Sequence, residues 1–138
     1  MKTIVIADSS GIISLISDTD KNHSLAIDIS SKLEKTKGSI IVPSDVFTET
    51  LNIAGKKIGH KIALFAGEKI LSEKTFLISD TNEKIRKRAL EIFKDQPESV
   101  SFTDCTVMAN ADLFKTKDIF GFDEVFRKNG YKRLGLDK

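Results

Sequence analysis

The chain has 138 residues, of which 40% are hydrophobic and 30% charged, so we expect one globular domain spanning residues 1–138. Its formal net charge of +2 is nearly balanced and does not by itself indicate a nucleic-acid binder. No apolar run approaches the roughly 20 residues of a membrane helix, and the opening run is too short for a signal peptide. A single cysteine, Cys105, excludes an internal disulfide. We therefore expect a cytoplasmic protein without membrane attachment.

Short apolar runs alternate with amphipathic stretches in the first half of the chain. The β-branched runs at residues 3–7 and 39–42 predict strands buried on both faces, as in a parallel sheet. Helices are predicted at residues 12–16, at 23–37, from Pro43 and a capping Ser44 to a break near Gly55 or Gly59, and from there to Leu71. Apolar side chains of the last two helices offer a face for a homodimer.

The second half continues this alternation. Strands are predicted at residues 75–78, 119–122 and 131–134, and residues 123–129 are expected to form a turn. One helix is expected to start at a capping Asp80 or Thr81 and end at Lys94, and another to run from about residue 101 to 115. Together the elements predict an α/β fold with a mostly parallel central sheet of about four to five strands, flanked by helices. Four phenylalanines are expected in the core and both histidines on the surface: Phe47, Phe65, Phe76, Phe93, His23 and His60.

Four carboxylates are expected at one edge of this sheet. Asp8 directly follows the first strand, and Asp123 directly follows the fourth. Glu49 and Asp104 lie in early turns of helices that follow other predicted elements. Because sites in parallel sheets form at the carboxyl ends of the strands, the four side chains are predicted to converge there.

Clustered carboxylates repel one another, and a bound cation relieves that repulsion. Oxygen ligands without a nearby cluster of histidine or cysteine favour Mg²⁺ or Mn²⁺ over zinc. Such an ion can activate water and stabilise charge on a phosphate oxygen. Basic clusters at residues 56–61, 84–88 and 127–133 either hold phosphates around this centre or are solvated helix faces. The hypothesis is a metal-dependent enzyme that cuts nucleic acid.

Each acid also has a purely structural interpretation. Asp8 and Asp123 are suited to capping the helix or turn that follows, and Asp104 forms a capping-box pattern with Ser101. Glu49 could be an ordinary solvent-facing helical residue. Three neighbouring acids could also contribute to the site, namely Asp45, Asp112 and Glu124.

Five segments resemble, in order, the motifs of a PIN domain: residues 4–10, 42–49, 101–105, 120–126 and 130–134. The resemblance covers essentially the whole chain. It implies a parallel sheet flanked by helices and a Mg²⁺- or Mn²⁺-dependent endoribonuclease. Carried over by position, it implies catalytic and metal-binding roles for Asp8, Glu49, Asp104 and Asp123, with hydrogen-bonding assistance from Ser9 and Thr103.

Small single-domain members of this family resemble the VapC toxins of toxin–antitoxin pairs. That resemblance implies a homodimer, an RNA substrate and a cognate antitoxin protein. A stand-alone RNA-processing nuclease would have the same sequence features. Two other classes also stay open: a phosphoacceptor receiver domain with an acidic Mg²⁺ pocket, and an inactive PIN-like scaffold that binds RNA or protein.

Overall fold

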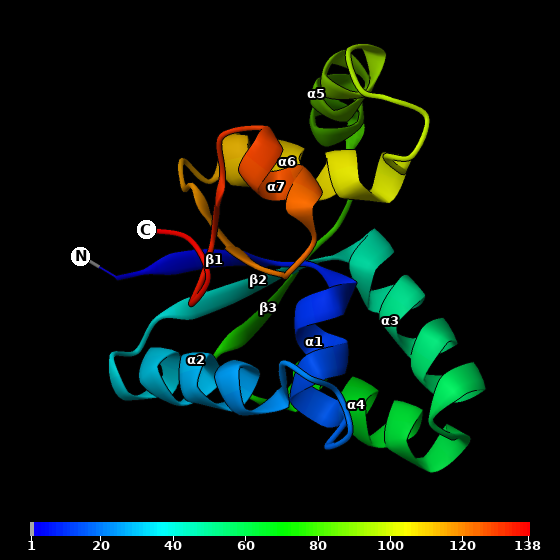
Figure 1. Cartoon of the computed structure of the whole chain (residues 1–138), viewed down its shortest axis with the longest axis vertical. Coiled ribbons are helices and arrows are strands. Elements are labelled where there is room, and N and C mark those ends of the chain that lie inside the picture. Colours follow the sequence, from blue (N-terminus) through cyan, green and yellow to red (C-terminus); the bar gives the residue numbers. More distant parts are fainter. Residues whose placement is uncertain (1) are drawn as a thin grey trace.

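Five parallel strands form one sheet in the computed structural model, which describes residues 2–138 (Figure 1). The strands are β1 Ile4–Ala7, β2 Ser39–Pro43, β3 Phe76–Ser79, β4 Asp118–Phe120 and β5 Lys132–Arg133. Their order across the sheet is β3-β2-β1-β4-β5, and every adjacent pair is parallel. The predicted parallel sheet is confirmed. A receiver domain has the strand order 2-1-3-4-5, so that alternative is wrong.

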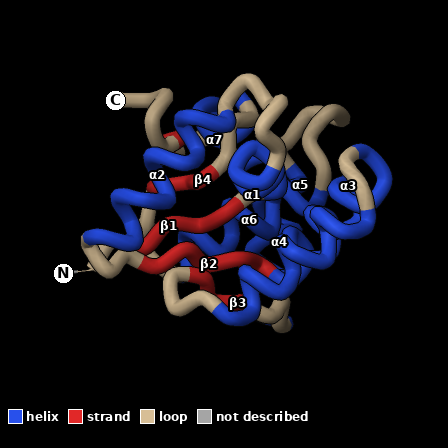
Figure 2. The backbone as a smooth tube through the Cα atoms, turned by 90° about the horizontal axis from the view of Figure 1, so that it is seen from below, coloured by secondary structure: helices blue, strands red, loops and turns tan. Residues whose placement is uncertain are grey.

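Helices cover both faces of the sheet (Figure 2). They are α1 Ser9–Ile16, α2 His23–Lys35, α3 Ser44–Lys57, α4 His60–Ser72, α5 Glu83–Lys94, α6 Phe102–Leu113 and α7 Glu124–Lys128. Figures 1 and 2 show α1, α2 and α4 on one face and α6 and α7 on the other, with α5 packed outside α6. Within residues 2–138, no helix has both the length and the apolar character needed to cross a membrane.

The core lies between the central strand β1 and the helix α6. Val5, Ile6 and Ala7 are fully buried, as expected for a strand covered by helices on both faces. Every residue from 105 to 111 of α6 is also buried, so this helix is enclosed by the sheet on one side and α5 on the other. Burying each large apolar side chain contributes about 1.5–3 kcal/mol, which makes β1 and α6 the structural centre.

Two predicted helix starts are wrong. Helix α5 is capped by Asn82, whose side-chain oxygen accepts from the Ile85 N–H at 2.9 Å. Thr81 is not the cap, because its N–H and hydroxyl donate to side chains of the first two residues of α3. Ser44 is the first residue of α3 and not its cap, and its hydroxyl accepts from Thr81 N instead.

Other differences concern the surface. Residues 124–128 of the predicted turn form the short helix α7. Phe65 and Phe93 are 56% and 40% exposed, because α4 and α5 are outer helices that bury only one stripe. His23 is half-buried, with Nδ1 at 2.8 Å from the Ser14 carbonyl oxygen.

A close approach joins the β1–α1 turn to the end of β4. The Asp8 N–H donates to the Phe120 carbonyl at 3.0 Å, and α1 then passes directly over that carbonyl. A Cβ on Gly11 would overlap the Phe120 carbonyl oxygen, and one on Gly121 would lie 2.7 Å from Asp8 Cβ. Glycine at both positions therefore lets Asp8 lie against the segment that leads to Asp123.

The two helical glycines Gly11 and Gly55 provide a matched test of this contact. Gly11→Ala should lower the free energy of unfolding by about 1–3 kcal/mol or more, because a backbone carbonyl must move to accommodate the methyl group. Gly55→Ala, whose nearest neighbour would be Ala63 Cβ at 3.9 Å, should raise it by about 0.5–1 kcal/mol. Urea denaturation measures both, and equal effects would rule out a tight α1–β4 contact.

Candidate active site

The four predicted acids line one pocket of about 470 Å³ at the carboxyl edge of the sheet. Asp8 follows β1, and Glu49 projects from the second turn of α3, which follows β2. Asp104 lies in the first turn of α6, and Asp123 lies between β4 and α7. We call this the acidic pocket. Four separate elements thus deliver one carboxylate each to the same space.

Hydrogen bonds from the helix α1, which Asp8 caps, fix the Asp8 side chain. It is 4% exposed, and its Oδ2 accepts from Ser10 Oγ at 2.8 Å and from Ser10 N at 3.4 Å. Ser10 Oγ in turn accepts from the Phe122 N–H at 3.0 Å, so this hydroxyl links Asp8 to the residue before Asp123. The side-chain hydrogen bonds described for Asp8 all use Oδ2. Capping and lining the pocket are therefore compatible roles for this side chain.

Electrostatics oppose ionisation of Asp8. Burial raises the pKa of its carboxyl group from 3.8 to about 7, against the two hydrogen bonds from Ser10. The carboxylates of Asp104 and Glu49 raise it further by repulsion. The pKa of Asp104 is also raised, by burial and by repulsion from Asp123 and Glu49. These carboxylates are close enough to disfavour one another's charge.

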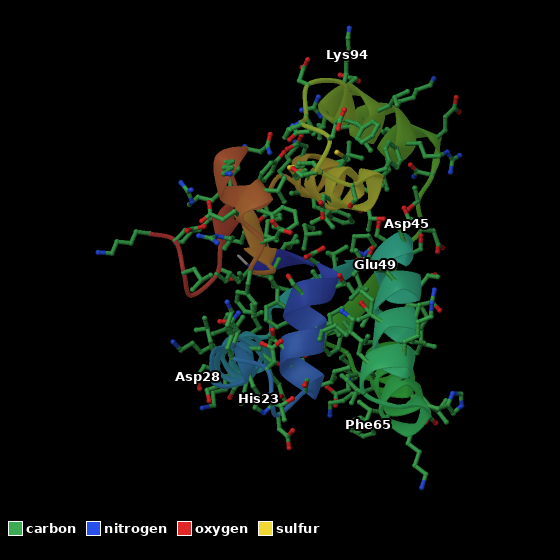
Figure 3. The ribbon with its side chains drawn as sticks, turned by 45° about the vertical axis from the view of Figure 1, so that its right-hand side comes forward. His23, Asp28, Asp45, Glu49, Phe65 and Lys94 are labelled. Carbon is green, nitrogen blue, oxygen red and sulfur yellow. The ribbon has the colours of Figure 1, made fainter. Side chains whose placement is uncertain are left out.

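Glu49 points into the acidic pocket. Its Oε1 accepts from Ser9 Oγ at 2.5 Å, and the side chain is half-buried. The solvent-facing interpretation of Glu49 is therefore wrong. Figure 3 shows Glu49 on α3 next to Asp45, one turn earlier on the same helix.

Asp104 and Asp123 are also helix caps. Asp104 and Ser101 form the predicted capping box: each backbone N–H donates to the other's side-chain oxygen at 3.1 Å. Asp123 caps α7, with Oδ1 accepting from the Val125 N–H at 3.1 Å. Each cap uses one carboxylate oxygen and fixes where the other points.

The neighbouring acids have partners elsewhere. Asp45 accepts from Thr81 Oγ1, Asp112 binds Arg88 and the Tyr131 hydroxyl, and Glu124 pairs with Arg127 and Arg133. None of the three lines the acidic pocket. Thr103 does not line it either, whereas Ser9 does.

Sequence reasoning missed the loop after α1. Asp20, Lys21 and Asn22 line the acidic pocket opposite the caps. Asp20 is held by Ser14 Oγ at 2.9 Å and by the Asn22 N–H at 2.8 Å. One sequence signal could have indicated this loop. Ser14 lies one helical turn after Ser10, so its hydroxyl is on the side of α1 that faces the pocket and can bond to Asp20. Lys21 supplies a cation at the rim of an otherwise acidic space.

The donor set suits a hard divalent cation. Among residues 2–138, no group of three Asp, Glu, His or Cys side chains is arranged to ligate one ion directly. Mg²⁺, however, keeps several waters and takes only one or two carboxylates directly. None of the ion pairs formed by the described residues includes Asp8, Glu49, Asp104 or Asp123. Repelling, unpaired carboxylates are the environment that such an ion would stabilise.

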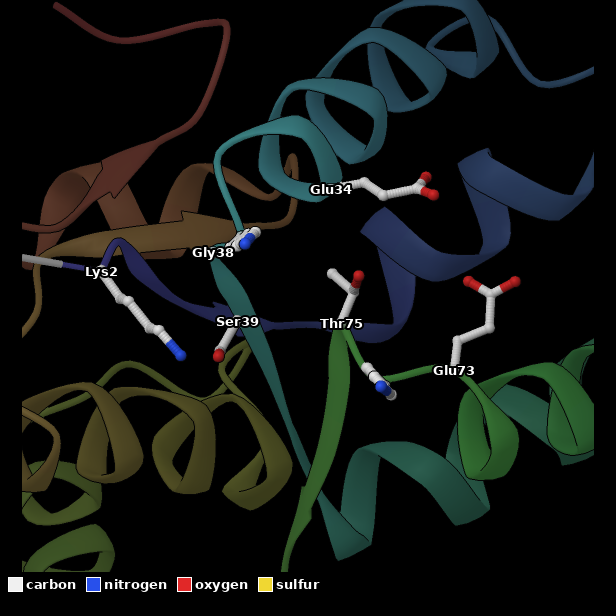
Figure 4. A pocket seen from close by; sticks show the side chains of 8 residues that line it. Lys2, Glu34, Gly38, Ser39, Glu73 and Thr75 are labelled. Carbon is white, nitrogen blue, oxygen red and sulfur yellow. The ribbon is translucent and has the colours of Figure 1, made fainter.

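A second pocket, of about 560 Å³, lies at the opposite, amino edge of the sheet (Figure 4). Three lysines and two glutamates line it: Lys2, Lys37, Lys74, Glu34 and Glu73. Glu73 already pairs with Lys69, and the backbone N–H groups of Gly38 and Ser39 are bonded within the fold. This pocket mixes charges of both signs and has no cluster of carboxylates, so the acidic pocket is the candidate active site.

Comparisons with known proteins agree with this geometry. The family model of the PIN domain matches residues 5–131. The crystal structure of Mycobacterium tuberculosis VapC20, a toxin that cleaves the sarcin-ricin loop, superposes with a TM-score of 0.84. The two chains are 20% identical over 96% of this chain and 98% of that one. At this identity, the likeness shows a shared fold. A comparison with curated proteins found no significant match.

Asp8 should make the metal-free protein less stable as the pH rises. Its raised pKa means that the folded chain holds the proton more tightly, so stability falls from about pH 4 and levels off above about pH 7. Asp8→Asn retains an effective cap and has no proton to lose. In EDTA, it should exceed wild type in free energy of unfolding by up to roughly 4 kcal/mol near pH 8. The gain should shrink toward about pH 4. Urea denaturation across this range is the measurement, and a pH-independent difference would contradict the assignment.

Proposed function

Because the chain belongs to the PIN domain family, we propose that it is a Mg²⁺- or Mn²⁺-dependent endoribonuclease that hydrolyses RNA phosphodiester bonds in the acidic pocket. One observation carries the proposal: four carboxylates from four separate elements meet in one pocket without a cationic partner among the described ion pairs. Family membership supplies the nuclease activity, and the pocket supplies chemistry that suits it.

The four acids would divide the work between metal binding and proton transfer. Asp8, Asp104 and Asp123 would hold the ion, one or two of them directly and the rest through its bound waters, and the ion would activate a water molecule and stabilise the charge on the phosphate. Glu49 would bind the ion as well or accept a proton from the attacking water. The Ser9 hydroxyl donates to Glu49 Oε1, so Oε2 would be the oxygen that accepts this proton.

Burial of Asp8 prepares this site for a cation. The carboxyl group sheds its proton readily only when a positive charge offsets the repulsion from Asp104 and Glu49. Metal binding would therefore release a proton near neutral pH and strengthen as the pH rises. Lys21 at the rim would contact the RNA backbone.

The fold similarity to the VapC20 toxin supports a toxin role. We propose that the protein is the toxin of a type II toxin–antitoxin pair, acts in the cytoplasm on RNA and is held inactive by a cognate antitoxin protein. A stand-alone RNA-processing nuclease is the alternative, and a small neighbouring gene for a DNA-binding partner would favour the toxin.

Exposed apolar side chains on α4 support a homodimer. Five large hydrophobic residues on or next to this helix face solvent: Ile58, Ile62, Leu64, Phe65 and Leu71. Ile62 and Phe65 lie one turn apart on one side of α4, and Leu64 and Leu71 lie two turns apart on the other. Exposed large apolar side chains that gather on a helix mark a candidate interaction site.

Cleavage of a structured RNA pool with Mn²⁺ and with EDTA tests the nuclease. Asp104→Asn should lower the cleavage rate at least about 100-fold, because the amide keeps the capping bond from Ser101 but removes the charge at the metal. Asp45→Asn is the matched control, since Asp45 also lies in a first helical turn but outside the acidic pocket. It should cleave at the wild-type rate.

Cleavage that survives EDTA, or Asp104→Asn protein as active as wild type, would contradict the metal-site proposal. Mn²⁺ should also raise the melting temperature of wild type and Asp45→Asn more than that of Asp8→Asn. This second readout does not depend on activity.

Light scattering tests the dimer. Wild type should have twice the 15.3 kDa mass of one chain, and Leu64→Glu should shift it to the single-chain mass by burying a charge in the interface. Leu90→Glu on α5 is the control, because Leu90 is 60% exposed and Leu64 54%. A monomeric wild type, or equal effects of the two variants, would exclude an α4 interface.

A further inference from the structure

A second cleft opens directly off the acidic pocket. It has a volume of about 510 Å³ and lies between the 95–100 loop and α7. Asp104 and Asp123 line both spaces, so the two adjoin at these carboxylates. A polynucleotide whose phosphate lies at the acidic pocket would have its neighbouring nucleotide beside this cleft.

The cleft combines apolar walls with an amide edge. Pro97, Val100 and Val125 provide the apolar surface. Gln96 and Asn129 stand together at one side, 33 residues apart in the sequence, and bond to each other through both amides. Apolar side chains beside a few polar groups are the usual lining of a small-ligand site, and an unpaired base has an apolar face and a polar edge.

The hydrogen bonds that Gln96 and Asn129 already make leave few of their donors and acceptors for a ligand. Asn129 spends both amide protons on Gln96 Oε1, at 3.1 Å, and on the Val125 carbonyl, at 2.9 Å. Its oxygen accepts from Gln96 Nε2 at 2.8 Å. Gln96 therefore keeps one N–H donor and one acceptor site, which point to opposite sides of its amide because Asn129 takes the edge between them. A base in the cleft can meet one of the two, and the acceptor suits an amino group.

Charge in the cleft favours a base and not a phosphate. Asp95 and Glu124 add carboxylates to those of Asp104 and Asp123, against one cation, Lys128. A phosphate would be repelled, whereas the amino group of cytosine, adenine or guanine would find hydrogen-bond acceptors on several sides. Uracil presents carbonyl oxygens where cytosine presents its amino group, so it fits this lining less well.

We propose that this cleft, bounded by Gln96, Pro97, Val125 and Asn129, binds the base of the nucleotide next to the bond that is cut, and prefers a base with an exocyclic amino group over uracil. The part of the proposal that concerns the cut bond rests on the proposed nuclease function. Base binding itself requires neither metal nor cleavage.

Cytidine and uridine form the decisive pair of probes, because they differ only at positions 3 and 4 of the pyrimidine. Cytosine presents an amino group beside an acceptor nitrogen, and uracil presents a carbonyl beside an N–H. Gln96 is the only glutamine of the chain, so glutamine-selective ¹⁵N labelling gives one assigned side-chain amide signal in NMR. Cytidine should shift this signal and bind about fivefold more tightly than uridine, the ratio expected for one hydrogen bond.

Filling the cleft should abolish the effect. Ser99 is an exposed residue that lines it, so Ser99→Trp should remove the cytidine shift while the melting temperature stays at the wild-type value. Thr36→Trp, at an exposed position after α2, is the control and should bind as wild type does. Cytidine binding that persists in Ser99→Trp, equal affinities for the two nucleosides, or an unmoved Gln96 signal would each overturn the proposal.

A cleavage experiment separates this proposal from the proposed function. RNA oligonucleotides that carry cytidine or uridine at each position around the cut should differ in cleavage rate at one adjacent position, and Ser99→Trp should erase that difference. Cytidine binding without any RNA cleavage would contradict the nuclease proposal and support the base site. RNA cleavage without base preference or nucleoside binding would support the nuclease and contradict the base site.

Discussion

Burial of the Asp8 carboxylate is the constraint on which this edge of the molecule depends. The side chain is 4% exposed and shares its surroundings with Asp104 and Glu49, so its charge is disfavoured by burial and by repulsion together. Such a group lowers the stability of the fold at neutral pH unless a cation is present. The acidic pocket is thus a place where stability has been given up for the capacity to bind positive charge.

The caps explain how repelling acids are held in place. Asp8, Asp104 and Asp123 each accept hydrogen bonds at a helix start, from Ser10, Ser101 and Val125. These bonds stabilise the carboxylates locally and fix their directions. A structural and a functional interpretation of each acid are therefore compatible, because one carboxylate has two oxygens to use.

Close packing of backbone brings the caps together. Gly11 lets α1 lie on the Phe120 carbonyl, and Gly121 leaves room for Asp8 at the end of β4. Ser10 then joins the two segments by accepting from Phe122 N. The same edge carries the second cleft, since the 95–100 loop meets α7 beside Asp104 and Asp123. The acidic pocket and this cleft thus share two lining residues.

The sequence by itself determined the alternation of strands and helices, the parallel sheet and the capping box at Ser101, because periodicity and local hydrogen bonding depend on neighbours along the chain. It did not determine which acid of a helix turns inward: Asp45 and Glu49 lie one turn apart, yet only Glu49 lines the acidic pocket. Asn82 caps α5 because Thr81 is hydrogen-bonded to Ser44 and Asp45, which lie 37 and 36 residues away in the sequence. Lys21 at the rim and the pairing of Gln96 with Asn129 likewise arise from contacts between segments that are distant in sequence. Only the tertiary structure decides such contacts, because they depend on how packed elements orient one another and not on the residues beside them.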